Sequence, residues 1–331
     1  MLLFHYFRTV KQQYVATIGF FDGVHIGHQH LVRQVTEAAQ ERGMRAMVIT
    51  FDRHPRSVFS PDAVPPLLTT REEKVRLLKG CGVDEIQFLH FDDKMAALSA
   101  REFMRQVLHD ELAVRTLVIG YDHHFGKPQF VPVERNNQAD SQGSVEGKQE
   151  LRLEGFADYQ SYGQEIGMEV IHAVEVPGDM HISSSVVRKA LMSGNLATAN
   201  RALGRPYQWS GRVVHGYAIG HQLGFPTANL EAEDGAKLLP ANGVYAIEVE
   251  CDGAVYPAML NIGTRPTLGG ADISVEAHLL GYDGDLYGRR LVLRFLERIR
   301  SEQRFESEQA LTRQLEADRE KVYRLTGYNS Q

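Results

Sequence analysis

The chain has 331 residues, of which 43% are hydrophobic and 24% are charged, the proportions of a globular protein long enough to form two domains. Its formal net charge is -6, with 23 basic and 25 acidic residues before Pro206 and 13 basic and 17 acidic residues from Pro206 onward. Because both halves are mildly acidic, we do not expect a nucleic-acid-binding surface.

The cysteines and the apolar segments predict the compartment. Cys81 and Cys251 are far apart and lack the spacing of a zinc site or a disulfide framework, which favours a reducing environment. The N-terminal residues do not read as a signal peptide, and no stretch approaches the roughly 20 apolar residues of a membrane span. We therefore expect a cytoplasmic protein that does not bind membranes.

The first half of the chain alternates between strand-like and helix-like segments. Strands are predicted at 14–21, 44–51, 85–91, 116–119 and 169–174, and helices at 28–42, 71–79, 100–112 and 155–166. Such alternation predicts a parallel sheet covered by helices on both faces. Polar and charged residues dominate from Glu134 to Glu150, which predicts an exposed, mobile loop.

The pattern changes in the second half. A helix is predicted at 184–192 and is followed by a segment at 196–203, after which Arg205 and Pro206 mark a domain boundary. Short strands at 209–215, 243–250, 255–262, 274–280 and 290–296 are separated by Gly, Pro and Asn, which predicts a small antiparallel barrel. A helix with one apolar face is predicted at 307–325. The predicted domains are therefore 1–205 and 206–331.

The clearest motif of the first half joins the first predicted strand to the first helix. It contains Gly19, Gly23 and the sequence His25-Ile-Gly-His28. Glycines allow close approach of the backbone to a ligand, and a helix N-terminus offers free N–H groups to phosphate. Both histidines can face one side of the first helical turn and donate hydrogen bonds to a phosphoryl group. Alone, the motif fits a glycine-rich turn with two exposed histidines at least as well.

A second candidate phosphate-binding segment lies at the start of the helix predicted at 184–192. Ser183, Ser184, Ser185 and Arg188 offer hydroxyl groups and one guanidinium to a triphosphate. The same residues fit an N-cap followed by a surface arginine, which is the commoner arrangement.

The second half contains a glycine-rich cluster that ends in a Pro-Thr-Ala-Asn turn. Gly216, Gly220 and Gly224 suit a phosphate-binding loop, whereas Thr227 and Asn229 offer the hard oxygen ligands that Mg2+ prefers. The glycines alone would also fit an ordinary turn of a barrel.

In this order, the motifs resemble the family of bacterial bifunctional riboflavin kinase/FAD synthetases. The first half carries His25-Ile-Gly-His28, Thr50-Phe-Asp-Arg-His54-Pro55, Gly120-Tyr-Asp122-His-His-Phe125-Gly126 and Ser183-Ser-Ser-Val-Val-Arg188. The second half carries the cluster from Gly216 to Leu230, Asn261-Ile-Gly-Thr-Arg265-Pro-Thr, Val275-Glu276-Ala-His278 and Asp285-Leu-Tyr-Gly288. The resemblance implies an α/β nucleotidyltransferase domain with a Rossmann-like fold, followed by a small antiparallel β-barrel riboflavin kinase domain with a C-terminal helix.

For the first half, the resemblance implies transfer of AMP from ATP to FMN, giving FAD and pyrophosphate. The residues expected to bind ATP are Gly19, Phe21, Asp22, Gly23, His25, His28, Asp122, Ser183, Ser184, Ser185 and Arg188. Of these, His25, His28 and Arg188 are expected to be catalytic, and His54 and Pro55 are expected near the flavin. No general base is required, because the attacking FMN phosphate is already an anion at neutral pH.

For the second half, the resemblance implies phosphorylation of riboflavin to FMN by ATP and Mg2+. Gly216, Gly220, Gly224, Thr227 and Asn229 are expected to bind the ATP phosphates, with Thr227 and Asn229 also binding the metal. Glu276 is the expected catalytic base. The riboflavin 5′-hydroxyl is a weakly acidic alcohol, so a carboxylate that accepts its proton suits the reaction. Without the resemblance, a cross-strand salt bridge would be the usual role of such a glutamate.

The sequence departs from the family pattern at three positions and leaves two alternatives to weigh. Arg53 stands where the family often has Pro, His124 where it often has an arginine or another residue, and His221 where a basic residue such as arginine is frequent. The HxGH motif is also a signature of class I aminoacyl-tRNA synthetases, but a lysine-rich second signature and a basic tRNA-binding region are missing. A flavin-binding protein with one decayed site is disfavoured, because both sets of motif residues are intact.

Overall fold

The computed structural model describes residues 12–59, 64–120, 124–127, 129–132, 149–152, 154–177, 182–215, 224–267 and 270–328. The chain divides into two compact units. The first unit comprises Met1–Pro65 and Arg71–Gly178, and the second unit comprises Pro66–Thr70 and Asp179–Gln331.

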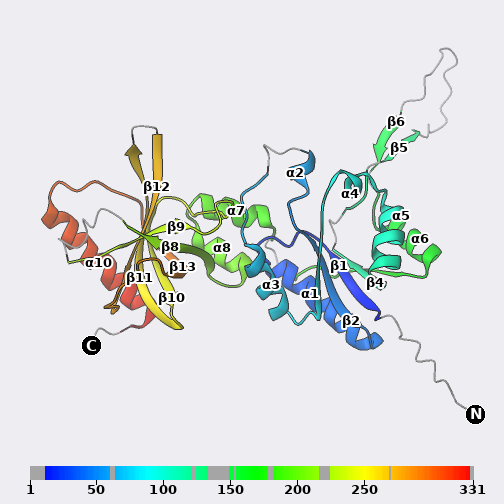
Figure 1. The fold of residues 1–331 in the computed structure, drawn as a ribbon, viewed down its shortest axis with the longest axis horizontal. Coiled ribbons are helices and arrows are strands. Elements are labelled where there is room, and N and C mark those ends of the chain that lie inside the picture. The colour runs from blue at the N-terminus through cyan, green and yellow to red at the C-terminus, as the bar shows by residue number, and fades with distance from the viewer. Residues whose placement is uncertain are drawn as a thin grey trace, which may run out of the picture. The chain divides into compact units, whose positions relative to one another are not determined.

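A parallel five-stranded sheet forms the centre of the first unit, as the sequence predicts. Its order is β3-β2-β1-β4-β7 (Figure 1), and the strands are β1 Tyr14–Ile18, β2 Arg45–Phe51, β3 Glu85–Leu89, β4 Val114–Ile119 and β7 Glu169–His172. The chain builds the sheet outward from β1, first through β2 and then through β4. Such a switch point creates a crevice at the carboxyl ends of the strands, where ligands bind in sheets of this kind.

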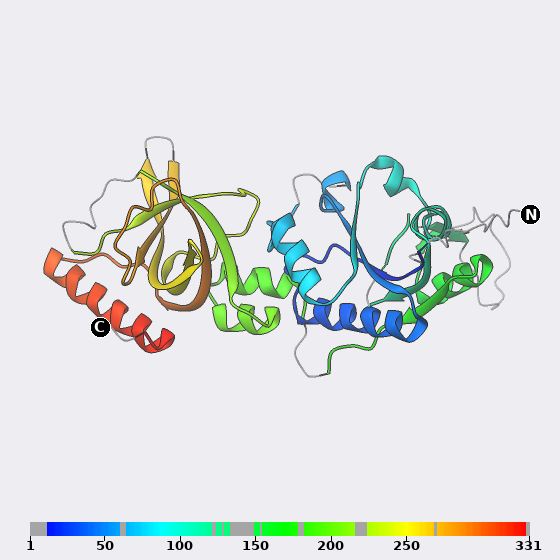
Figure 2. The same cartoon turned by 60° about the horizontal axis from the view of Figure 1, so that its bottom comes forward.

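Helices cover both faces of this sheet (Figure 2). They are α1 Ile26–Arg42, α2 Arg56–Phe59, α3 Arg71–Gly80, α4 Asp93–Ala97, α5 Ala100–Glu102 and α6 Phe156–Ile166, with α5 continuing as the π-helix η2 Phe103–Glu111. The alternating side chains of β1 explain the two layers: Val15 packs toward α1, whereas Ala16 packs toward η2 and α6.

A short hairpin lies within the polar region of the first unit. Its strands are β5 Gln129–Pro132 and β6 Gln149–Arg152, which pair antiparallel. The prediction of a loop from Glu134 to Glu150 was therefore wrong at its end, because Gln149 and Glu150 pair with β5. Residues 133–148 lie outside the described residues.

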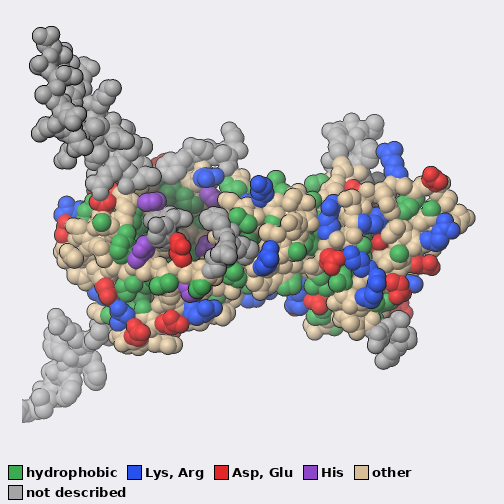
Figure 3. Space-filling model, turned by 180° about the vertical axis from the view of Figure 1, so that it is seen from behind, with side chains coloured by type: hydrophobic (Ala, Val, Ile, Leu, Met, Phe, Trp, Pro, Cys, Tyr) green, Lys and Arg blue, Asp and Glu red, His purple; other side chains and the backbone are tan. Residues whose placement is uncertain are grey.

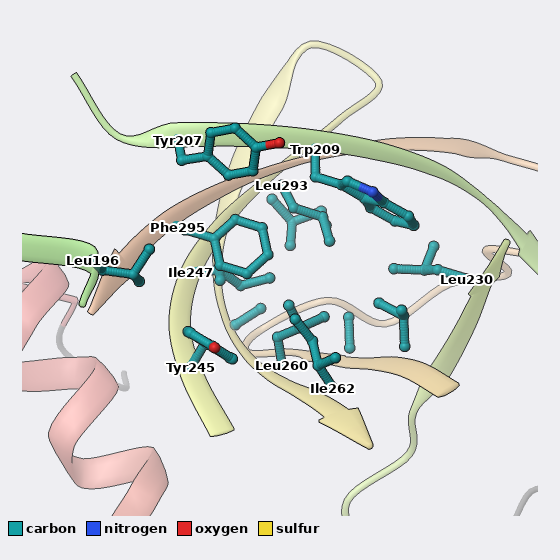
Figure 4. Packing of buried hydrophobic residues seen from close by; sticks show 14 of the residues in the cluster. Leu196, Tyr207, Trp209, Leu230, Tyr245, Ile247, Leu260, Ile262, Leu293 and Phe295 are labelled. Atoms are coloured by element: carbon teal, nitrogen blue, oxygen red, sulfur yellow. The ribbon is translucent and has the colours of Figure 1, made fainter. Parts of the chain in front are cut away.

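A closed antiparallel barrel forms the centre of the second unit and confirms the predicted fold class. Its order is β10-β11-β12-β9-β8-β13, and the strands are β8 Tyr207–Val214, β9 Ala228–Ala232, β10 Gly243–Cys251, β11 Ala254–Thr267, β12 Gly270–Leu279 and β13 Arg290–Arg300. Figure 4 shows large apolar side chains turned toward the centre of the barrel, among them Trp209, Leu230, Ile247, Leu260 and Phe295. Because alternate residues of each strand point inward, apolar side chains fill the interior of the barrel.

Helices of the described chain also belong to the second unit. They are α7 Ser184–Met192, α8 Leu196–Leu203 and α10 Glu308–Thr326. Apolar residues of α7 and α8 share one core with the barrel, and α10 packs on the outer surface through Leu315 and Val322. The compact second unit thus begins before Pro206, and the limits 1–205 and 206–331 stay a prediction for the two activities.

Within the part of the chain that the structure describes, no helix is long and apolar enough to cross a lipid bilayer.

Candidate active sites

The HxGH motif forms the turn between β1 and α1, at the carboxyl end of the sheet. His25 is the N-cap of α1, and the backbone N–H of His28 donates a hydrogen bond to His25 Nδ1 at 3.3 Å. The two imidazole rings stack with their centroids 3.6 Å apart. A Cβ atom on Gly27 would lie 3.1 Å from the His25 ring, so glycine leaves room for this stack. Both imidazoles therefore face the same side of the helix start.

The turn before His25 has an unusual backbone conformation. Phe21, Gly23 and Val24 have φ angles of 52°, 80° and 40°, and the two non-glycine residues are buried. Positive φ is costly for a β-branched residue such as valine, and such strain gathers at ligand-binding sites. The Gln29 side chain holds this conformation by donating to the Val24 carbonyl at 2.8 Å.

Two buried side chains converge on the carbonyl of Phe20, next to this turn. Thr50 Oγ1 donates to it at 3.1 Å and Lys74 Nζ donates to it at 2.6 Å. The Lys74 ammonium also lies 3.9 Å from the centroid of the Phe20 ring. Burial lowers the pKa of Lys74 to about 8, although the Asp22 carboxylate opposes this shift. The site thus includes a buried cation beside the predicted ATP-binding residue Asp22.

The residues predicted near the flavin follow β2. His54 and Pro55 precede α2, and the backbone N–H of Arg56 donates to His54 Nδ1 at 3.1 Å. The His54 ring meets the Phe20 ring edge to face, with centroids 4.6 Å apart. Phe20 therefore links the predicted flavin residues to the turn that precedes His25. Figure 3 shows several histidine side chains around a hollow on one face of the first unit.

Two of the residues that depart from the family pattern make hydrogen bonds in the first unit. The Arg53 guanidinium lies 2.8 Å from His90 Nε2, and His90 Nδ1 lies 2.6 Å from the Asp52 carboxylate. The His124 ring nitrogen Nδ1 lies 2.9 Å from the Glu154 carbonyl and can donate to it. The third such residue, His221, lies outside the described residues, as does the predicted ATP ligand Asp122.

The predicted triphosphate segment belongs to the second unit. Ser183 is the N-cap of α7, with its Oγ accepting a hydrogen bond from the Val186 backbone N–H at 3.3 Å. Arg188 Nε donates to the Pro66 carbonyl at 2.8 Å. The N-cap arrangement weighed from the sequence is thus present, and the ATP-binding roles of Ser183, Ser184, Ser185 and Arg188 stay predictions.

The residues predicted for the kinase reaction lie together at one edge of the barrel. Asn229 of β9 stands opposite Glu276 of β12, and the Thr227 hydroxyl donates to Glu276 Oε2 at 3.5 Å. Hydroxyl, amide and carboxylate oxygens form a donor set that fits Mg2+. Gly224 precedes this turn with a φ of 76°, whereas Gly216 and Gly220 lie outside the described residues.

The described residues at this edge of the barrel do not form a complete metal site by themselves. Among the described residues there is no group of three or more His, Cys, Asp or Glu side chains placed to hold a metal ion. Mg2+ typically keeps several water ligands and binds through one or two protein side chains together with substrate phosphates. The Thr227 and Asn229 oxygens match that mode of binding.

A cavity of about 140 Å³ opens beside Thr227. Strand ends and the segment after β12 line it, including Thr227, Ala277, Leu279, Tyr282, Asp285 and Tyr287. Tyr287 stacks on His215 with centroids 4.1 Å apart, and Tyr282 meets Tyr256 edge to face. Polar and apolar groups share this lining, and Thr227 is the residue that the cavity has in common with the cluster of Thr227, Asn229 and Glu276.

His278 lies two residues beyond Glu276 and was given no role from the sequence. Its Nδ1 lies 2.7 Å from the Pro226 carbonyl, in the peptide that leads into Thr227. Burial lowers the pKa of His278, the nearby Arg319 lowers it further, and the bond to Pro226 opposes the shift. Lys74 was missed likewise, although a lysine four residues before the buried Leu78, on the apolar face of α3, was an available signal.

Two family models match the chain. One is described as FAD synthetase and matches residues 7–155, and the other is described as riboflavin kinase and matches residues 203–326. The two matches fall on the halves that carry the HxGH turn and the Thr227 cluster, respectively.

Curated relatives match over nearly the full length. A bifunctional riboflavin kinase/FMN adenylyltransferase of Pseudomonas fluorescens is 37% identical, covering 95% of this chain and 93% of its own. The corresponding protein of Escherichia coli K12 is 39% identical, covering 92% of this chain and 90% of its own. A crystal structure described as a macrolide-efflux protein from Streptococcus pneumoniae superposes with a TM-score of 0.80 at 31% identity, covering 94% of both chains.

Proposed function

Since this chain belongs to the family of bifunctional riboflavin kinase/FMN adenylyltransferases, we propose which of its residues carry each reaction. The enzyme phosphorylates riboflavin to FMN and transfers AMP from ATP to FMN, giving FAD. The proposal assigns adenylyl transfer to the turn around His25 and His28, and phosphorylation to Thr227, Asn229 and Glu276. The observation that carries it is the difference between the stacked imidazoles of the HxGH turn and the cluster of Thr227, Asn229 and Glu276, each suited to one of two nucleophiles.

Adenylyl transfer needs alignment and charge stabilisation. An oxygen of the FMN phosphate attacks the α-phosphorus of ATP, and the bond to pyrophosphate breaks. His25 and His28 present their stacked rings at the start of α1, where N–H groups and the helix dipole favour a phosphoryl group. Arg188 is proposed to neutralise the departing pyrophosphate. Gly19, Phe21, Asp22, Gly23, Asp122 and the three serines from Ser183 are proposed to hold ATP, with His54 and Pro55 near the flavin.

Phosphorylation of riboflavin needs a proton acceptor. The 5′-hydroxyl oxygen attacks the γ-phosphorus of ATP, the bond to ADP breaks, and the hydroxyl proton passes to the Glu276 carboxylate. Thr227 and Asn229 are proposed to hold Mg2+, which neutralises phosphate charge when it is bound. Gly216, Gly220 and Gly224 are proposed to contact the ATP phosphates.

The compartment and the limits of the two activities are also proposed. Neither Cys81 nor Cys251 takes part in a disulfide, which is compatible with a reducing cytoplasm. Residues 1–205 are proposed for adenylyl transfer and residues 206–331 for phosphorylation.

Two substitutions test the division of labour. His28→Ala is expected to slow FAD formation from FMN by about 10²-fold or more while FMN formation continues, because only the first reaction uses the imidazole. Glu276→Ala is expected to block FMN formation from riboflavin and to spare FAD formation from FMN. Chromatographic separation of the flavins measures both rates in each variant. Loss of both reactions in either folded variant would contradict two separate sites.

A further inference from the structure

His278 and Glu276 share one face of β12, because side chains two residues apart in a strand point to the same side. Glu276 faces the Thr227 hydroxyl, whereas His278 lies 2.7 Å from the Pro226 carbonyl. A carbonyl oxygen only accepts hydrogen bonds, so the imidazole must carry its hydrogen on Nδ1 to make this bond. The two neighbouring side chains of β12 thus hold consecutive residues of the Pro-Thr turn.

The backbone pairing at this edge is short. β12 and β9 pair through Glu276 with Asn229 and through Ala277 with Ala228, and among the described residues their register ends there. Pro226 has no N–H group with which to extend the ladder. The hydrogen bond from His278 to the Pro226 carbonyl therefore holds the chain at the point where the backbone pairing between β12 and β9 ends.

The fixed group is the peptide that joins Pro226 to Thr227. Holding its carbonyl sets the orientation of the Thr227 backbone and hence the direction of the Thr227 hydroxyl. That hydroxyl makes only a long hydrogen bond of 3.5 Å to Glu276, which by itself constrains it weakly.

Side-chain packing also supports the turn that contains Pro226 and Thr227. Phe225 is buried, and its ring meets the His278 ring edge to face with centroids 5.4 Å apart. The Arg319 guanidinium of α10 lies 5.5 Å from the Phe225 ring centroid. The ring contacts hold His278 in place, so its Nδ1–H can act as a rigid donor.

We propose that His278 is a positioning residue of the kinase site, whose Nδ1–H fixes the Pro226–Thr227 peptide and thereby places the Thr227 hydroxyl against Glu276. This inference rests on the proposed kinase roles of Thr227 and Glu276. Loss of the donor misaligns a group that acts in phosphoryl transfer, so kcat falls more than the KM for riboflavin rises.

The test compares two replacements of the same ring. His278→Phe keeps a ring against Phe225 but has no donor, whereas His278→Asn keeps a donor close to the position of Nδ1. We expect His278→Phe to lower kcat for FMN formation about tenfold and His278→Asn to recover most of it. Both variants should convert FMN to FAD at the wild-type rate. Wild-type kcat in His278→Phe, or a folded His278→Asn that is as slow as His278→Phe, would overturn the proposal.

A measurement on the unaltered enzyme covers the case in which a variant does not fold. Nitrogen NMR of the imidazoles, with the His278 signal identified by its loss in one variant or by sequential assignment, is expected to show the Nδ1–H tautomer at neutral pH. The Nε2–H tautomer would overturn the proposal. Glu276→Ala serves as the reference for the site: if it still forms FMN, the proposed kinase site fails. An inactive Glu276→Ala together with wild-type kcat in His278→Phe refutes only the positioning role.

Discussion

Lys74 places an ammonium group almost out of contact with water. Only 5% of the residue is exposed, and its partners are the Phe20 carbonyl and the face of the Phe20 ring. A buried charge is costly unless it is hydrogen bonded and paired, and Asp22 supplies opposite charge nearby. A buried ammonium group beside the HxGH turn suits a site proposed to bind the phosphates of ATP.

The lowered pKa of Lys74 predicts a pH-dependent stability. The folded enzyme releases the proton near pH 8, whereas the unfolded chain keeps it up to a pKa of 10.5. Between these pH values the unfolded state binds more protons, so folding stability rises with pH. Relative to Lys74→Met, the wild type should gain up to about 3 kcal/mol in the free energy of unfolding across this range. Denaturant titrations followed by circular dichroism at several pH values measure the difference.

The matched control for Lys74→Met is Lys79→Met, which removes an exposed lysine from the same helix. A difference between wild type and Lys74→Met that stays constant with pH would show that the Lys74 amine is not desolvated in solution.

The residues proposed to take part in the chemistry are easier to recognise in the sequence than the residues that position them. His25, His28, Thr227, Asn229 and Glu276 are recognisable because their functional groups suit phosphate, Mg2+ or proton transfer within short motifs. Lys74 and His278 act on the carbonyls of Phe20 and Pro226, and those contacts join segments far apart in the chain. Nothing local in the sequence indicates which carbonyl a side chain will meet.

Helix α10 is attached to the barrel by a buried ion pair. Asp318 is 1% exposed, and its carboxylate accepts hydrogen bonds from Arg300 Nε at 2.9 and 3.2 Å and from Gln314. Arg300 lies at the end of β13. Because α10 also carries Arg319 against Phe225, its attachment supports the turn that leads to Thr227.

Asp318→Ala is expected to destabilise the second unit. Its removal leaves the Arg300 guanidinium, 17% exposed, without its carboxylate, and breaking such a pair costs about 3 kcal/mol. The single tryptophan, Trp209, is buried in the barrel core, so its fluorescence reports unfolding of this unit in urea.

The control for Asp318→Ala lies on the same helix. Lys321 forms a more exposed ion pair with Glu297 at 2.6 Å, and Lys321→Ala should cost less than about 1 kcal/mol. Equal effects of the two substitutions would contradict a special role for the buried pair.

Elements were predictable where periodicity was strong. The helix predicted at 184–192 matches α7 to the residue, because its apolar residues recur at helical spacing. The first strand ends at Ile18 rather than residue 21, since Phe21 adopts a positive φ in the turn. β9 was not predicted: Ala-Asn-Leu-Glu-Ala has few β-prone residues, and its strand conformation comes from pairing with β8 and β12.

Across the full chain, two different folds serve two related transfers of phosphorus groups. In the proposed division of labour, the parallel sheet presents a helix start to an anionic nucleophile, whereas the barrel presents the Glu276 carboxylate to an alcohol. The product of the second reaction, FMN, is the substrate of the first. The family matches cover both halves, so a single polypeptide contains the machinery for consecutive steps.

The most direct test of this account supplies the purified wild-type chain with riboflavin, ATP and Mg2+ and separates the flavins over time. We predict that FMN forms first and that FAD follows, with neither product formed in Glu276→Ala and with FAD formation alone slowed by about 10²-fold or more in His28→Ala. FAD formation from riboflavin at the wild-type rate in His28→Ala, or the absence of any product with the wild type, would contradict the proposed sites.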